Sequence, residues 1–294
     1  MKLLYAARIA RFDLLRSINI LARNVTRWSY EDDANLHHLM CYINSTLSMK
    51  MIGWVGDKLD DLCLALYADA DFAGCAQCLC STSGSHFHVQ GKHTRFPLAG
   101  GGKRQGCVSH STPEAEFVAA DTALRTLELP SISIWKVLAN KFPHLLVHDD
   151  NQGMIGVVRS RRNPTMRHLQ RTHEISIASL HEHFQRDHFL LIYEISAKMA
   201  ADIHTKGFKN PLAWKKACML INLLEPGDLS SKELADIVTP GTDVDTTVRQ
   251  AFQSKTDDIP NFPYTETPIL PKEVYQKRLT SKERYNVCLV WIPL

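Results

Sequence analysis

LCLALYADAD, residues 62–71, is the stretch that decides the fold class, because seven apolar residues run without a break into Asp69 and Asp71. A continuous apolar run of this length predicts a strand that is buried on both faces, as in a sheet covered by helices. The same arrangement returns in LLVHDDNQG, residues 145–153, where a second apolar run leads into Asp149 and Asp150. Two strands of this kind indicate an α/β domain.

The segments around these strands complete the pattern of a mixed sheet. Residues 78–111 are rich in Gly, Ser and basic residues with short β-branched or aromatic pieces, which predicts strands joined by hairpin turns. Ser111, Pro113 and Glu114 signal the start of a helix. FLLIYEI, residues 189–195, predicts a further strand before a helical segment that contains Asp202. We therefore expect a mixed sheet of about five strands with helices on its faces.

Composition places the chain among ordinary globular proteins. It has 294 residues, of which 45% are hydrophobic and 22% charged, and this excludes a fibrous or wholly disordered chain. The formal net charge is only +3, so any binding of nucleic acid needs a local basic patch. No apolar run is long enough to span a bilayer, and charged residues interrupt the apolar start of the chain. We expect a cytoplasmic or nuclear protein that is not secreted, has no membrane partner and keeps its cysteines reduced.

Acidic residues follow several of these elements and form the candidate site. Asp69 and Asp150 end strands, Glu116 lies in the first turns of a helix, and Asp202 lies in a later helical segment. Because the carboxyl ends of neighbouring parallel strands open on the same edge of a sheet, such side chains can converge. Converging carboxylates repel each other unless cations neutralise them, and oxygen ligands favour Mg²⁺ or Mn²⁺ over zinc. Acids at strand ends and helix starts are also common as caps, and the spacing alone leaves both interpretations open.

Six blocks of sequence carry a resemblance to a known family. In chain order they resemble the ribonuclease H domain of copia-type LTR retrotransposon polyproteins, over about residues 62–208. The blocks are YADADFAG (67–74), STSG (81–84), KRQGCVSHSTPEAEFVAAD (103–121), HDDNQ (148–152), RTHEISIASLHEHF (171–184) and MAADIHTKGF (199–208). The resemblance implies a ribonuclease-H-like fold and hydrolysis of the RNA strand of RNA–DNA hybrids with two Mg²⁺ or Mn²⁺ ions.

The resemblance also assigns the metal-binding catalytic acids one by one. Asp69 matches the first acid, and Glu116 rather than Glu114 matches the helix acid. The third acid falls on Asp150, the residue before Asn-Gln, and the last falls on Asp202 in the Ala-Asp pair. No catalytic His is assigned.

The resemblance divides the chain into three parts. Residues 1–60 resemble the end of the reverse transcriptase that precedes this domain, residues 61–208 form the ribonuclease-H-like domain, and residues 209–294 form a tail that we expect to be largely disordered. A reverse-transcriptase domain acting in trans is an implied partner.

Basic residues near the acidic blocks are candidates for binding the hybrid. Contacts to a nucleic-acid backbone rest on Arg and Lys, although a charge run on a solvated surface is the common alternative. The candidates are Arg159, Arg161, Arg162, Arg167, Arg171, Lys103 and Arg104.

Three other interpretations compete with this one. A catalytically silent retrotransposon remnant could still bind nucleic acid or support a polymerase. An integrase-like transferase is disfavoured, because the acids lack its spacing and a zinc module is not evident. Zinc binding by Cys75, Cys78 and Cys80 is disfavoured as well, because a second ligand pair at suitable spacing is missing.

Overall fold

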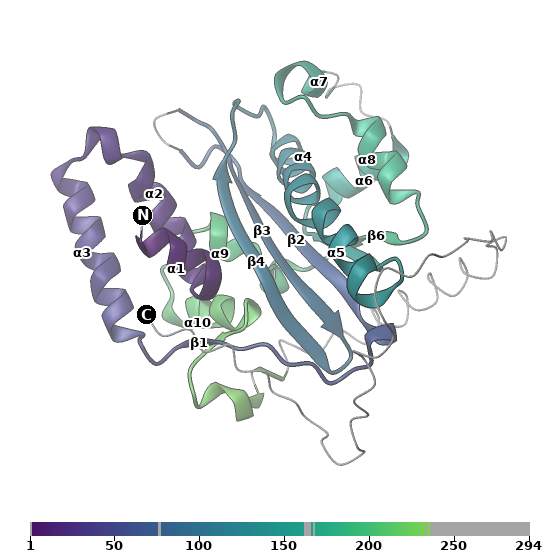
Figure 1. Ribbon diagram of the computed structural model, residues 1–294. Helices are drawn as coiled ribbons and strands as arrows, with labels where there is room; N and C mark the ends of the chain where they lie inside the picture. Colours follow the sequence, from purple (N-terminus) through teal and green to yellow (C-terminus); the bar gives the residue numbers. More distant parts are fainter. Residues whose placement is uncertain (1, 76–77, 162–165, 167, 233, 236–294) are drawn as a thin grey trace, which may run out of the picture.

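The computed structural model describes residues 2–75, 78–161, 166, 168–232 and 234–235, and a mixed five-stranded sheet lies at its centre (Figure 1). The strands have the order β4-β3-β2-β5-β6. Neighbours β4, β3 and β2 are antiparallel, whereas β5 and β6 run parallel to β2. Their bounds are β2 Cys63–Asp71, β3 Thr82–Gly91, β4 Thr94–Arg104, β5 Leu145–Asp149 and β6 Phe189–Tyr193. The expected ribonuclease-H-like arrangement, a mixed five-stranded sheet with flanking helices, is confirmed.

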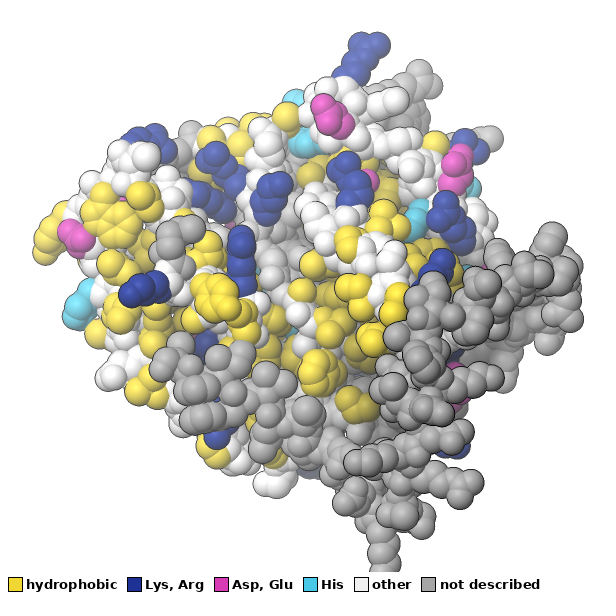
Figure 2. All heavy atoms as spheres, in the orientation of Figure 1, with side chains coloured by type: hydrophobic (Ala, Val, Ile, Leu, Met, Phe, Trp, Pro, Cys, Tyr) yellow, Lys and Arg dark blue, Asp and Glu magenta, His cyan; other side chains and the backbone are white. Residues whose placement is uncertain are grey.

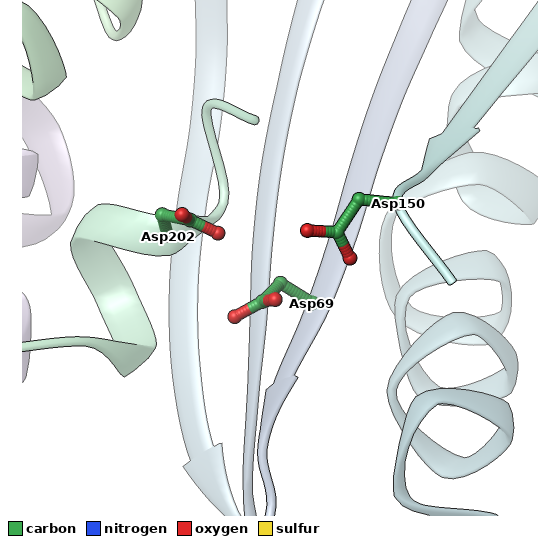
Figure 3. A group of neighbouring side chains, drawn as sticks. All are labelled: Asp69, Asp150 and Asp202. Carbon is green, nitrogen blue, oxygen red and sulfur yellow. The ribbon is translucent and has the colours of Figure 1, made fainter. Parts of the chain in front are cut away.

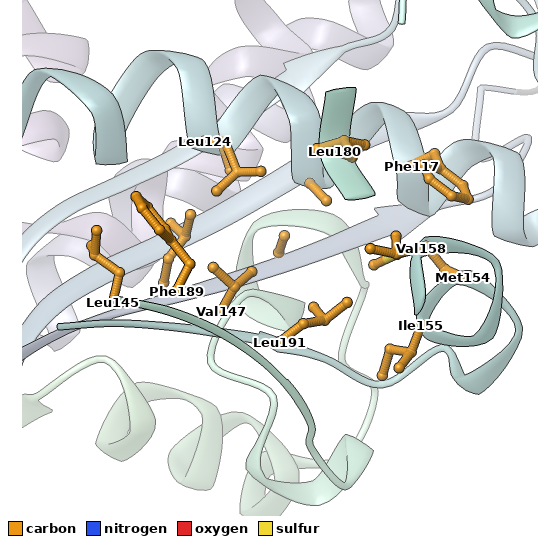
Figure 4. Packing of buried hydrophobic residues seen from close by; sticks show 14 of the residues in the cluster. Phe117, Leu124, Leu145, Val147, Met154, Ile155, Val158, Leu180, Phe189 and Leu191 are labelled. Carbon is orange, nitrogen blue, oxygen red and sulfur yellow. The ribbon is translucent and has the colours of Figure 1, made fainter. Parts of the chain in front are cut away.

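One face of the sheet is covered by the helices that follow β4 and β5. Alternate residues of β2, such as Leu64 and Leu66, point to this face and pack with Phe117, Val158 and other buried apolar side chains (Figure 4). Since successive side chains of a strand point to opposite faces, both faces of β2 must be apolar, which is why its sequence reads as a continuous run. The helices are α4 Thr112–Ala123, α5 Leu129–Ala139, α6 Gln152–Ser160, α7 Leu169–Thr172 and α8 Ile177–Phe184.

The other face is covered by the two ends of the described chain. Ala65 and Tyr67 of β2 share a second hydrophobic cluster with Leu15, Ile203 and Ile221. Residues 50–51 and 223–224 pair as a small antiparallel sheet that ties these ends together. The elements are α1 Lys2–Ala10, α2 Leu15–Arg23, α3 Tyr30–Ser45, β1 Lys50–Met51, α9 Asp202–Thr205, α10 Pro211–Leu220 and β7 Leu223–Leu224.

Regular structure is present at the start of segment 209–294, which we expect to be a largely disordered tail, within residues 209–232. Helix α10 and strand β7 lie there, and Ala217, Leu220 and Leu223 are buried in the second cluster. Arg95 of β4 holds the segment, since its guanidinium donates to the Leu220 carbonyl at 2.6 Å and to Asn222 Oδ1 at 2.9 Å. These tertiary contacts stabilise a segment that has a weak helical pattern of its own. Residues 236–294 lie outside the described residues.

None of the helices in the described residues combines the length and the apolar character that crossing a membrane requires.

Candidate metal centre

Three aspartates from three separate elements meet at the carboxyl edge of β2 and β5. Asp69 lies near the end of β2, Asp150 directly follows β5, and Asp202 begins α9. One carboxylate oxygen of each lies within 4.8 Å of an oxygen of the other two, and Figure 3 shows the three side chains converging. Because β2 and β5 are parallel neighbours, the fold places the first two acids side by side.

Close packing of α9 against the sheet brings Asp202 to the other two acids. Gly84 of β3 lies opposite Asp69 in the β2–β3 register, and a Cβ at Gly84 would lie 2.5 Å from Thr205 Cγ2 and 3.0 Å from the Ala201 carbonyl. Only glycine leaves room for α9 at this distance. The Thr205 hydroxyl in turn donates a short hydrogen bond to Asp69 Oδ2.

Asp150 and Asp149 have different surroundings although they are adjacent. The Ser196 hydroxyl donates to Asp150 Oδ2 at 2.6 Å, so the segment before α9 orients this carboxylate. Asp149 is fully buried, and its Oδ1 accepts from the Asn151 backbone N–H at 2.8 Å. Burial raises the pKa of Asp149 well above its ordinary value, and the charges of Asp150 and Asp69 act in the same direction.

Glu116 on α4 belongs to the same electrostatic group. Its side chain is buried, and its Oε2 has no hydrogen-bond partner among the described residues. Burial raises the pKa of Glu116 to about 10, and the negative charges of Asp149, Asp69 and Asp150 add to the shift. Burial and the charge of Asp69 likewise raise the pKa of Asp202 to about 7.

Glu114, two residues before Glu116 on α4, contacts other groups. Its Oε2 lies 3.1 Å from His168 Nε2, and its Oε1 lies 3.2 Å from His173 Nε2. The backbone N–H of His110 donates to the same carboxylate at 3.0 Å. Glu114 therefore links the start of α4 to the α7 region, whereas Glu116 faces the aspartates.

Two cations at this edge have no counterpart in the sequence predictions. Lys206 Nζ lies 2.8 Å from Asp202 Oδ1 and 3.3 Å from Asp69 Oδ1. Arg16 of α2 donates from Nε to the Thr205 carbonyl at 2.9 Å, and its charge acts on Asp71. A lysine four residues after Asp202 is the signal that could have revealed the first contact, since residues i and i+4 share one face of a helix. Arg16 is 189 positions from Thr205, and its contact has no local signal.

The residues of this edge fit a hard divalent cation. Asp69, Asp150 and Asp202 converge there, and burial together with neighbouring negative charges raises the pKa values of Glu116, Asp149 and Asp202. Carboxylate oxygens are the ligands of Mg²⁺ and Mn²⁺. The unpaired, buried Oε2 of Glu116 is a further oxygen available to an ion.

The predicted hybrid-binding residues are spread over the surface. Arg159 lies at the C-terminal end of α6 and donates to the Leu191 carbonyl at 3.2 Å, whereas Asp150 precedes the other end of that helix. Arg161 follows α6 and pairs with Glu182, and Arg171 is exposed on α7. Lys103 and Arg104 end β4. Arg162 and Arg167 lie outside the described residues.

The cysteines of the β2–β3 connection are close to one another. Hydrogen bonds from Cys75 and Cys80 lower the pKa of Cys78 to about 7, and Arg104 adds a favourable charge. Within the described ranges, however, Asp69, Asp150 and Asp202 are the group whose ligand atoms lie close enough together to hold an ion.

No protein-family model matches the chain. Among solved structures, the chain has some likeness to the NurA nuclease from Sulfolobus solfataricus, with a TM-score of 0.29 and 10% sequence identity. The likeness covers 75% of this chain and 65% of that one.

Proposed function

We propose that the protein is a metal-dependent nuclease, namely a copia-type ribonuclease H that hydrolyses the RNA strand of RNA–DNA hybrids. The observation that carries the proposal is the convergence of Asp69, Asp150 and Asp202, with Glu116 beside them, on a mixed five-stranded sheet. These are the positions that the sequence resemblance assigns to the four acids. The meeting of three of them in space from distant segments, with the charge of Glu116 coupled to two of the three, supports one shared role.

The carboxylates would hold two Mg²⁺ or Mn²⁺ ions, which supply activation of a water molecule and stabilisation of the leaving oxygen. Asp69 takes part in both relations, since its carboxylate lies within 4.8 Å of those of Asp150 and Asp202 and its charge acts on Glu116. The Ser196 and Thr205 hydroxyls keep Asp150 and Asp69 in fixed orientations. Glu116 must lose its proton to act as a ligand. A bound cation would favour that loss, because its positive charge stabilises the buried carboxylate.

A basic groove next to the site supports a polyanionic substrate. A cavity of about 840 Å³ lies between α2, β4 and α4, and Arg8, Arg23, Lys103 and Arg104 line it. Its floor includes Gly84, the register partner of Asp69. Figure 2 shows Lys and Arg side chains on the face of the molecule that carries these elements. Lys and Arg contacts to phosphates position a duplex without reading its sequence, so we expect little base preference.

The test is cleavage of a labelled RNA–DNA hybrid by the purified protein in Mg²⁺ or Mn²⁺. We expect cutting of the RNA strand only, loss of cutting in EDTA, and no cutting of double-stranded DNA. Asp150→Asn should reduce the rate at least about a thousandfold, since it removes a charged ligand of the reacting centre. Asp187→Asn, at an exposed position away from the carboxylates, is the matched control and should leave the rate unchanged.

A folded protein that binds the hybrid and does not cut it would overturn the proposal. That result would favour the alternative role, a silent remnant that binds nucleic acid or supports a polymerase. Cutting of double-stranded DNA as fast as of the hybrid would retain a nuclease and reject ribonuclease H specificity.

A further inference from the structure

Lys206 lies where a cation bridging Asp69 and Asp202 would bind. Its ammonium group is 2.8 Å from Asp202 Oδ1 and 3.3 Å from Asp69 Oδ1, so it touches two of the three aspartates. Its positive charge also interacts electrostatically with the carboxyl groups of Glu116 and Asp150. Among the described residues, Lys206 is therefore the cation in ion-pair contact with Asp69 and Asp202.

The ammonium group and an ion at the same place exclude each other. A Mg²⁺ ion binds carboxylate oxygens at about 2.0–2.1 Å, and an ion bound in this way by Asp69 and Asp202 would take the volume that Lys206 Nζ occupies. Two positive charges at such a distance also repel each other strongly. An ion between Asp69, Asp150 and Glu116 would meet no such competitor at contact distance, because among the described residues Lys206 forms ion pairs with Asp69 and Asp202 and none with Asp150 or Glu116.

The surroundings of Lys206 leave it free to move away. Its side chain is 40% exposed, whereas that of Asp69 is 2% exposed. It lines a cavity of about 620 Å³ between α2, α3 and the α9–α10 segment, together with Gly207 and Phe208. A long side chain at such a place can rotate into the cavity while α9 and Asp202 stay in position.

We propose that Lys206 is a resident counter-ion of the Asp69–Asp202 pair and is displaced when a divalent ion binds there. The inference rests on the proposed function in so far as it requires an ion at these carboxylates. It adds that the two ion positions are unequal, because only the ion on the Asp202 side has to displace an ammonium group. Lys206 thereby keeps the carboxylates paired without metal and limits how readily the second ion is loaded.

The test measures Mn²⁺ binding directly, by electron paramagnetic resonance of free Mn²⁺ and by titration calorimetry. The wild-type protein should show a tighter and a weaker site. Lys206→Met keeps the length of the stem and removes the charge, so it should raise the affinity of the weaker site about tenfold and leave the tighter one nearly unchanged. Lys206→Arg keeps the charge and should retain weak binding at that site. Lys209→Met is the matched control, since Lys209 lines the same cavity and has no contact with the carboxylates, and it should bind as wild type.

A second measurement, the melting temperature with and without Mn²⁺, detects a loss of folding stability in the Lys206→Met variant. Lys206→Met leaves Asp69 and Asp202 without their counter-ion, so it should melt at a lower temperature than wild type in EDTA and gain more from Mn²⁺ than wild type does. Unchanged or weaker Mn²⁺ binding by Lys206→Met would overturn the inference, as would an absence of Mn²⁺ binding by every variant. Tighter binding in Lys206→Met without cleavage of the hybrid by the wild-type protein would support the inference and reject the proposed function.

Discussion

Replacement of Glu116 by Gln should stabilise the metal-free protein, although it removes a proposed metal ligand. Glutamate has an ordinary pKa of 4.5, and burial together with Asp149 and Asp69 raises that of Glu116 to about 10. At pH 7 the carboxyl must therefore take up a proton on folding, at about 1.4 kcal/mol for each pH unit above 4.5. The cost is about 3 kcal/mol, and a glutamine of the same shape does not incur it. For a chain of this size we expect a rise in melting temperature of roughly 5–10 °C.

The pH dependence has a definite sign. A carboxyl whose folded pKa is raised stabilises the protein fully below pH 4.5, and this contribution is lost as the pH rises toward 10. The advantage of Glu116→Gln over wild type should thus be small at pH 5 and grow steadily to pH 8. Thermal and urea unfolding in EDTA measure it, with Glu182→Gln as a control that should change stability little, because the ion pair of Glu182 with Arg161 is exposed. In Mg²⁺ the stability advantage of Glu116→Gln over wild type should become smaller or reverse. Ion binding stabilises the protein with the wild-type carboxylate and not the protein with the amide.

Lower stability of Glu116→Gln than of wild type in EDTA at pH 8 would contradict this role of Glu116. A stability difference that does not change between pH 5 and pH 8 would refute it as well, since it would show that protonation of this carboxyl is not the cause.

Three further predictions concern folding stability and Mn²⁺ binding. Burial holds the pKa of His204 at about 3 and that of His86 well below 6.5, so each should lower the unfolding free energy by about 1.4 kcal/mol between pH 7.5 and pH 5.5, as the unfolded chain alone takes up protons; urea titrations of His204→Gln and His86→Gln beside wild type at the two pH values isolate these contributions from that of Glu116, and an equal pH dependence of variant and wild type would contradict them. Gly84→Ala should force α9 from the sheet and weaken Mn²⁺ binding, whereas Gly101→Ala, whose nearest neighbour at 2.9 Å is a rotatable Ser85 hydroxyl, should keep it; equal binding by both variants would count against the packing argument. Arg95→Met should cost about 2–4 kcal/mol in urea unfolding, because it leaves the Leu220 carbonyl buried and unpaired; a loss below 1 kcal/mol would show that α10 is held by other contacts.

The sheet and the positions of the acids could be predicted because their signals are local. A buried strand that ends in an acid shows in consecutive residues, as around Asp69 and Asp150, and parallel neighbours then place the two at one edge. The cap at Ser111 marks the start of α4 in the same local way, since its hydroxyl accepts from the Glu114 N–H.

The surroundings of the acids could not be predicted because they come from tertiary packing. In the sequence Lys206 looks like a solvated lysine, and it turns inward only because α9 packs against Gly84. Helix α10 has a weak pattern of its own and depends on Arg95, more than a hundred residues earlier. The basic run around Arg159 and Arg161 is close to Asp150 in sequence, but a helix of nine residues separates them in space.

The packing of both ends of the described chain on one side of the sheet has a practical consequence for dissecting the protein. Fragment 61–208, cut at the boundaries that the sequence suggests, contains all four acids yet lacks α1, α2, α10 and β7. Ala65, Tyr67 and Leu146, buried beneath those elements, would then face water. An apolar sheet face of this extent promotes self-association. The excised fragment should therefore precipitate. The solubility of the purified protein would then depend on residues that take no part in the chemistry.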